Sequence, residues 1–200
     1  MKKTFFAVLL FLIAIPLSAH VVVKPSEVGI GAFQTFSIGV PVEKDIPTIG
    51  IKLLIPEGLD YVSPNVKTGW KITVKKNGTD ESAKVTEIDW TGGVIPAGQR
   101  DDFVFSAKVP STETSLIWKA YQTYQDGTVV AWDISSSEQP KKSDGSPDFS
   151  KSGPFSETKV IDDLSTKKSS SSTPLMISIV ALVFSIISLG KSRRSKTNVV

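Results

Sequence analysis

The sequence predicts an all-β fold, an immunoglobulin-like antiparallel β-sandwich with a C-terminal disordered stalk and a single transmembrane helix. Three features carry this prediction. Short segments rich in Val, Ile, Thr, Phe and Trp alternate with Gly and Pro, a serine-rich tract follows them, and one apolar run lies near the carboxyl end. Several short strands with turn residues between them are typical of sandwiches. A chain of 200 residues leaves room for one core of ordinary size.

Residues 1–19 have the layout of a secretory signal peptide, since two lysines precede an apolar run that ends in small residues at Ala19. An uncleaved membrane anchor is the alternative, but the run is short and no stop-transfer charges follow it. We therefore expect export and cleavage after Ala19, so that the mature protein begins at His20.

Residues 20–134 are expected to form the sandwich, because they hold short runs of β-branched and aromatic residues between Gly and Pro. The dipeptides Asn77-Gly78 and Asp126-Gly127 accept the positive φ angles of hairpin turns. In Asp102–Val109 apolar residues occupy every second position, as they do in a half-buried strand. The expected strands are His20–Lys24, Phe33–Val40, Thr48–Ile55, Trp70–Lys76, Lys84–Trp90, Asp102–Val109, Leu116–Tyr124 and Thr128–Asp133.

Residues 135–173 are expected to form a flexible linker, since 13 of these 39 residues are serine and few are large and apolar. Such a tract buries too little surface to offset the entropy lost on ordering. Its short patch Val160-Ile161 could still dock on the domain.

Residues 174–190 form an apolar run of 17 residues, followed by a basic tail at 191–200. As a helix the run would rise about 25 Å, at the short end for a bilayer core of about 30 Å. A buried core helix is the alternative, although the run stands between a serine-rich tract and the basic tail. We expect one membrane span with the tail in the cytoplasm and residues 20–173 outside the cell.

The exported part is mildly acidic, because all 20 acidic residues lie in 20–173 while six of the 23 basic residues lie elsewhere, which leaves a formal charge of −3. A nucleic-acid partner is therefore not indicated. The chain has no cysteine, and its two methionines, Met1 and Met176, lie outside the predicted ectodomain. Copper(I), which prefers thiolate and thioether ligands, would find neither there.

His20 is the only histidine of the chain and stands first in the expected mature protein. A free α-amine and the Nδ1 atom of the same residue form a chelate, and the amide nitrogen of Val21 offers a third in-plane donor. Nitrogen and oxygen donors in a square-planar arrangement favour copper(II). The alternative is that His20 is merely a polar first residue that the signal peptidase tolerates.

Two further residue types suit a copper site. Glu43 and Asp45 follow the strand Phe33–Val40 and offer carboxylate oxygens, although on these residues alone a solvated turn balanced by Lys44 is the favoured interpretation. Trp132 ends the last expected strand, where an indole face could cover a cation. With no cysteine and one histidine, a zinc site of several His or Cys ligands is excluded. No nucleophile-elbow glycine pattern supports a Ser-His-Asp triad.

Several motifs follow one another in a fixed order over His20–Asp133. They are Ala19-His20-Val21 with Pro25 and Glu27, Val40-Pro41 with Glu43 and Asp45, Gly69-Trp70, Trp90 with Gly92-Gly93, Ile95-Pro96 and Gly98, and Tyr121-Gln122 with Tyr124, Asp126-Gly127 and Trp132. In these motifs the chain resembles the YcnI-like family of bacterial proteins. The resemblance implies a β-sandwich that binds copper(II) through the mature amino-terminal histidine, a carboxylate and a nearby tryptophan, here His20, Glu43 and Trp132. Val42 departs from the polar residue expected beside the carboxylate.

The leading hypothesis is a membrane-tethered extracytoplasmic copper(II)-binding protein, not an enzyme, which stores, buffers or delivers copper. Its partners would be the copper ion and a copper transporter or another cuproprotein. A copper-dependent oxidative enzyme is one alternative, but the copper brace of the polysaccharide monooxygenases needs a second histidine, which this chain lacks. A metal-free structural or adhesive ectodomain is the other.

Overall fold

The computed structural model describes residues 20–162. The predicted signal peptide at 1–19, the rest of the predicted linker at 163–173, the apolar run at 174–190 and the basic tail at 191–200 lie outside the described residues. Within the described part of the chain, no helix has the length and apolar character needed to cross a bilayer.

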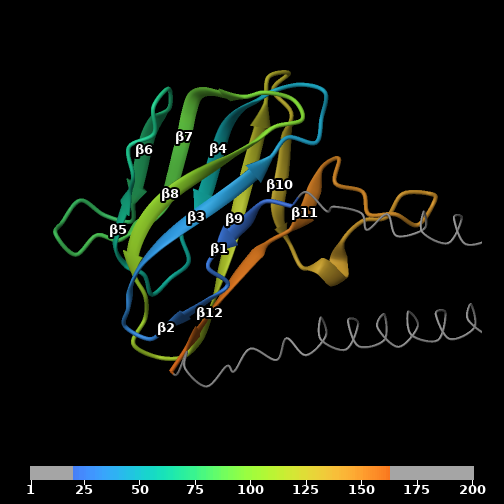
Figure 1. The fold of residues 1–200 in the computed structure, drawn as a ribbon. Helices are drawn as coiled ribbons and strands as arrows, with labels where there is room; N and C mark the ends of the chain where they lie inside the picture. The colour runs from blue at the N-terminus through green and yellow to red at the C-terminus, as the bar shows by residue number, and fades with distance from the viewer. Residues whose placement is uncertain (1–19, 163–200) are drawn as a thin grey trace, which may run out of the picture. The chain divides into compact units, whose positions relative to one another are not determined.

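The strands form two layers, as Figure 1 shows, and the prediction of an all-β sandwich is confirmed. Most strand pairs are antiparallel, and residues 20–162 contain no α-helix. One sheet has the order β1 (Val22–Lys24), β3 (Phe33–Pro41), β8 (Arg100–Lys108) and β5 (Asp60–Pro64). The other has the order β11 (Ser152–Pro154), β10 (Val129–Ile134), β9 (Thr114–Tyr124), β4 (Thr48–Leu54), β7 (Val85–Ile95) and β6 (Lys71–Lys76), with β12 (Ser156–Ile161) paired to β9 and to β2 (Glu27–Gly29).

The core lies between the two sheets and follows the predicted alternation. In β8 Phe103 and Phe105 are fully buried, and Phe36 of β3 is buried beside them. The Phe105 ring lies 5.4 Å from Phe36 in its own sheet and 5.5 Å from Trp118 in the other, measured between centroids. Each such side chain stabilises the fold by about 1.5–3 kcal/mol relative to exposure.

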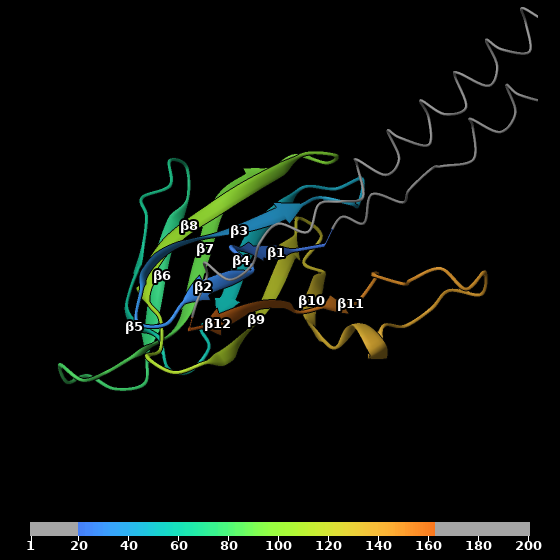
Figure 2. The same ribbon diagram turned by 60° about the horizontal axis from the view of Figure 1, so that its bottom comes forward.

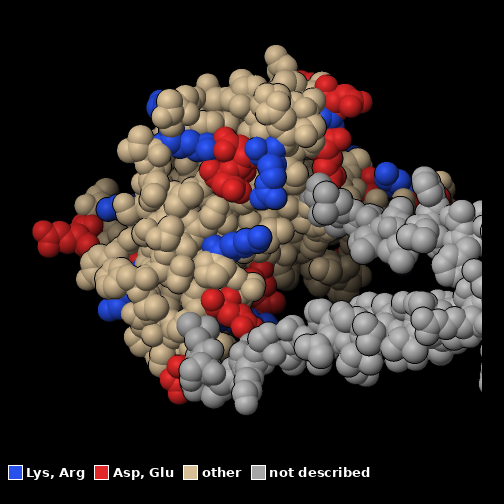
Figure 3. Space-filling view, in the orientation of Figure 1, with Lys and Arg blue, Asp and Glu red and all other residues tan. Residues whose placement is uncertain are grey.

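Several charged side chains lie on the outer face of the smaller sheet. Figure 3 shows acidic and basic groups side by side on this face. Two ion pairs involve β8: Lys67 with Asp101 at 2.8 Å, and Arg100 with Asp102 at 3.2 Å. Exposed pairs of this kind contribute about 0–1 kcal/mol each, so the apolar core is the larger source of stability.

All eight predicted strands are present, with ends that differ by a few residues, and the Asp126-Gly127 hairpin is confirmed: Gly127 has φ +82° between β9 and β10. Two details differ. β7 continues past Trp90 through Gly92-Gly93, where a Cβ on Gly93 would lie closer than 3.0 Å to the Trp70 ring. The Asn77-Gly78 pair lies in a longer loop, which Asn77 closes by accepting a 2.8 Å bond from the Lys84 amide at Oδ1.

The prediction of a linker beginning at residue 135 is wrong for 135–162. β11 pairs in parallel with β10, and β12 pairs antiparallel with β9, so both orange strands in Figures 1 and 2 belong to the sandwich. The expected docking of Val160-Ile161 is confirmed, since Val160 is 1% exposed. These short strands obtain their backbone hydrogen bonds from β9 and β10 and therefore need few apolar side chains.

Candidate metal centre

The three residues singled out by the sequence come from separate parts of the fold. His20 lies just before β1, Glu43 just after β3, and Trp132 within β10. β1 pairs with β3 in antiparallel register, with Val22 opposite Gly39. The chain that enters β1 therefore lies beside the chain that leaves β3.

Trp132 lies against His20, and it shares with Glu43 a surface hollow that His20 does not line. Its ring lies 5.9 Å from the imidazole of His20, measured between centroids, at an interplanar angle of 54°. Trp132 and Glu43 both line a surface hollow of about 250 Å³. Because Glu43 is exposed, His20 half-buried and Trp132 buried, the candidate site faces solvent on one side and rests on the indole on the other. Asp45, the second carboxylate considered from the sequence, does not line this hollow.

The Trp132 side chain is held from two directions. Its Nε1 atom donates a 3.3 Å hydrogen bond to Oε1 of Gln122 in the neighbouring strand β9. Its Cε3 and Cζ3 atoms lie against Gly153 of β11, so closely that a Cβ there would come within 3.0 Å of them. The hydrogen bond and the contact with Gly153 therefore restrain the indole from two sides.

Phe149 completes an aromatic group around His20 and was missed by the sequence analysis. Its ring meets the imidazole edge-on, with 4.8 Å between centroids, and lies nearly parallel to Trp132 at 6.0 Å. Phe149 falls in the segment predicted as linker. The available signal was its size, because Phe149 and Phe155 are the two aromatic residues of that serine-rich tract.

Gln139 holds the loop that carries Phe149. Its Nε2 atom donates to the carbonyl oxygens of Asp148 at 2.8 Å and Ser152 at 3.2 Å, which joins the beginning of the loop to its end. The position of Phe149 is therefore fixed by hydrogen bonds within the loop as well as by its contact with Trp132.

Tyr124 lies directly beside Glu43. Burial, followed by the negative charge of Glu43, raises the pKa of Tyr124 to about 12. The neighbouring Lys44 turns toward the β9–β10 hairpin, where its Nζ atom donates to Oγ1 of Thr128 at 2.9 Å and lies 4.5 Å above the Tyr124 ring. Lys44 thus anchors the loop after β3 to the β9–β10 hairpin, next to the carboxylate of Glu43.

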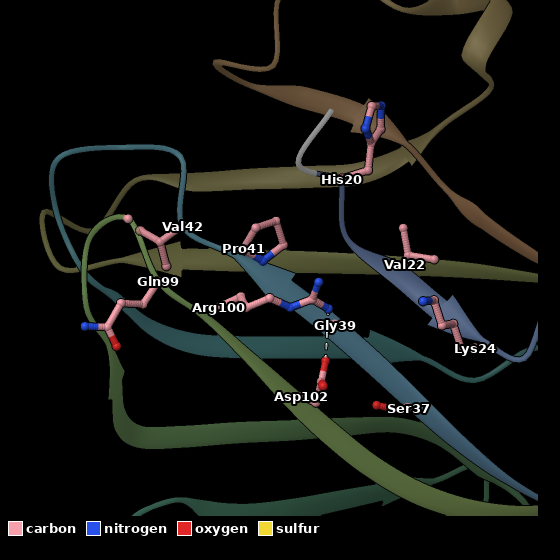
Figure 4. A pocket seen from close by; sticks show the side chains of 11 residues that line it. His20, Val22, Lys24, Ser37, Gly39, Pro41, Val42, Gln99, Arg100 and Asp102 are labelled. Atoms are coloured by element: carbon pink, nitrogen blue, oxygen red, sulfur yellow. Dashed lines mark hydrogen bonds and ion pairs between the residues drawn. The ribbon is translucent and has the colours of Figure 1, made fainter. Parts of the chain in front are cut away.

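A larger cavity of about 450 Å³ begins at His20 and extends over β1, β3 and β8. Figure 4 shows the imidazole of His20 pointing away from Arg100 and Asp102, which lie inside this cavity. The His20 ring therefore belongs to the group formed with Trp132 and Phe149.

The donor atoms near Trp132 fit a copper ion only in part. No group of three or more His, Asp or Glu side chains that could hold a metal occurs within residues 20–162. His20 supplies an imidazole nitrogen and Glu43 a carboxylate oxygen, both of which copper(II) accepts. A metal bound here needs further donors from the main chain or from water.

Comparisons with known proteins point to one family and one fold. A family model described as a domain of unknown function, DUF1775, matches residues 20–149. The copper-binding protein CutI of Bacillus subtilis (strain 168) is 34% identical over 202 residues, which cover 94% of this chain and 92% of that protein.

Among solved structures, an uncharacterized protein from Nocardia farcinica, described as having an immunoglobulin-like fold, is similar with a TM-score of 0.55. It is 25% identical, and the match covers 72% of this chain and 99% of that one. The sandwich is therefore immunoglobulin-like, as the sequence predicted.

Proposed function

Since the chain belongs to the DUF1775 family, the YcnI-like proteins, we propose that it is a copper(II)-binding protein at the outer face of a membrane. Copper binding is supported at the level of the family by the copper-binding relative, which aligns over nearly the whole chain. The oxidation state, the ligands and the cellular role are parts of this proposal.

The observation that carries the proposal is that His20 lies against Trp132 while Glu43 lines the same surface hollow as Trp132. Cleavage after Ala19 would create an α-amine on the residue whose imidazole lies beside Trp132. The amine and Nδ1 of His20 would bind the ion as a chelate, with an oxygen from Glu43. Two nitrogens and one oxygen form a donor set that suits copper(II).

Trp132 and Phe149 would act as a cover and not as ligands. Both rings lie against the imidazole, and they would restrict its movement and limit the access of water. Residues 20–162 contain neither Cys nor Met, so copper(I) would lack its preferred sulfur ligands. Reduction would therefore favour release, which suits storage, buffering or delivery to a copper transporter or another cuproprotein.

We place binding ahead of catalysis because the chain has a single histidine, whereas an oxidative copper brace uses two. The proposed arrangement in the cell is export, removal of residues 1–19, and anchoring by a helix at 174–190. With the sandwich extending to residue 162, the linker shortens to 163–173.

The direct test is titration with copper(II) of a protein whose first residue is His20, verified by mass. The matched control carries one additional glycine ahead of His20, which keeps every side chain but moves the α-amine away from the imidazole. We expect tight binding only for the correctly processed protein, and loss of binding for His20→Ala. Equal affinity of the processed and extended proteins would rule out the proposed chelate.

A further inference from the structure

We propose that Gln122 is the positioning residue of the copper site, holding both Trp132 and the end of β3 that leads to Glu43. This inference rests on the proposed copper site. Gln122 would act through its hydrogen-bonded neighbours, Pro41 and Trp132.

Gln122 is 0% exposed, and both the nitrogen and the oxygen of its carboxamide form hydrogen bonds within the protein. Its Nε2 atom donates to the carbonyl oxygen of Pro41 at 2.9 Å and to Oγ1 of Thr48 at 2.7 Å. Its Oε1 atom accepts from Nε1 of Trp132 at 3.3 Å. An indole N–H can only donate and a carbonyl can only accept, so these partners fix which way the amide points.

The bond to Pro41 connects the two sheets at the site. Gln122 belongs to β9 of the larger sheet, whereas Pro41 ends β3 of the smaller one, two residues before Glu43. The amide of the intervening Val42 donates to the carbonyl of Gln99 at 2.9 Å, so the backbone before Glu43 is fixed on both sides. One carboxamide thus sets the position of the indole and of the backbone that carries the carboxylate.

Burying an amide in a sandwich core costs desolvation free energy, whereas the apolar side chains that usually fill such a core do not carry this cost. The described core holds two other fully buried polar side chains, Thr48, which is itself a partner of Gln122, and Thr158. Oγ1 of Thr158 accepts from Nε1 of Trp118 at 3.0 Å and donates to the carbonyl of Pro25 at 2.8 Å. This pair has the same pattern of indole, polar side chain and proline carbonyl, but Trp118 and Thr158 line none of the hollows around His20 and Glu43.

The test compares Gln122→Met with Thr158→Val in the processed protein, using copper(II) titration against a competing chelator. Both substitutions keep the volume of the side chain and leave an indole N–H and a proline carbonyl without their partner. We expect copper(II) affinity to fall about 10- to 100-fold for Gln122→Met, as for other residues that orient a metal's ligands, and to stay unchanged for Thr158→Val. Equal losses in the two variants would show that Gln122 serves stability alone.

A double-mutant cycle measures the coupling between two substitutions in their effect on copper(II) affinity. General destabilisation of the fold would not produce such a coupling. If Gln122 acts partly through the indole, Gln122→Met should cost less affinity in a Trp132→Phe background than in the wild-type protein. Strictly additive losses would overturn the positioning role. Should Gln122→Met not fold, Gln122→Asn, which keeps an amide but is too short to reach all three partners, carries the same expectation.

The wild-type titration separates the two proposals. A wild-type protein that fails to bind copper(II) would overturn the proposed function and this inference with it. Tight wild-type binding that Gln122→Met and Gln122→Asn leave unchanged would overturn the inference alone.

Discussion

Gly153→Ala should displace Trp132 without altering any proposed ligand. The added methyl group would lie within 3.0 Å of Cε3 and Cζ3 of the indole and 3.4 Å from Cδ1 of Phe149. Carbon atoms pack best at about 3.5–4.0 Å, so the indole or β11 must move by about 1 Å or more. The indole is restrained on its other side by the bond from Nε1 to Gln122.

The expected cost of this overpacking is about 1–3 kcal/mol, which corresponds to a fall in melting temperature of roughly 3–12 °C. Copper(II) affinity should fall as well, because the indole would no longer lie against His20. The assays are thermal unfolding followed by circular dichroism, and copper(II) titration at a temperature where the variant is folded.

Gly50→Ala in β4 is the matched control. A methyl group there would meet Cβ of Thr123 at 3.4 Å, an ordinary contact, in another strand of the same sheet. We expect a melting temperature that is unchanged or slightly higher, and unchanged copper(II) affinity. If Gly153→Ala behaves like Gly50→Ala in both assays, the indole is not confined as the structure indicates, and the reasoning about Trp132 fails.

Four further outcomes are expected. Glu43→Gln should lower the pKa of Tyr124 from about 12 toward its ordinary value, because it removes a neighbouring negative charge. Ultraviolet titration of the tyrosine measures this pKa, and an unchanged pKa would show that the charge of Glu43 does not act on Tyr124. Since the folded pKa of Tyr124 is raised, its contribution to stability is present below about pH 10 and is lost between about pH 10 and 12, which unfolding curves at those pH values would detect. Copper(II) affinity should fall below neutral pH, because the α-amine of His20, with a reference pKa of about 7.7–8.0, must lose its proton to bind; a flat pH profile would argue against amine ligation. Protease added to intact cells should release a fragment that ends within 163–173, whereas cleavage inside 152–161 would contradict the strands β11 and β12.

The sequence predicted some residues of the candidate site around His20 and missed others. His20 and Glu43 were identified by residue type and motif, and Trp132 by its place at the end of a predicted strand. Phe149 and Gln122 were not identified as parts of the site. Phe149 lies in a serine-rich tract and Gln122 lies inside an apolar strand. The residues next to them in the sequence do not indicate which distant residues they contact.

The sequence by itself determined the strands whose side chains alternate and whose turns have a required chemistry. β8 was predicted because Phe103 and Phe105 face one side of a strand, and the β9–β10 hairpin because Gly127 adopts a positive φ at no steric cost. Both are properties of a few adjacent residues, which a linear sequence displays directly.

Only the tertiary structure decided where the domain ends and what surrounds His20. β11 and β12 are ordered because β9 and β10 offer them unpaired backbone groups, a property of the neighbouring strands and not of residues 152–161. The register of β1 against β3 brings the chain before β1 beside the loop that carries Glu43, although 23 positions separate His20 from Glu43. Contacts between distant residues depend on how whole strands pair, and that pairing is settled by the packing of the complete core.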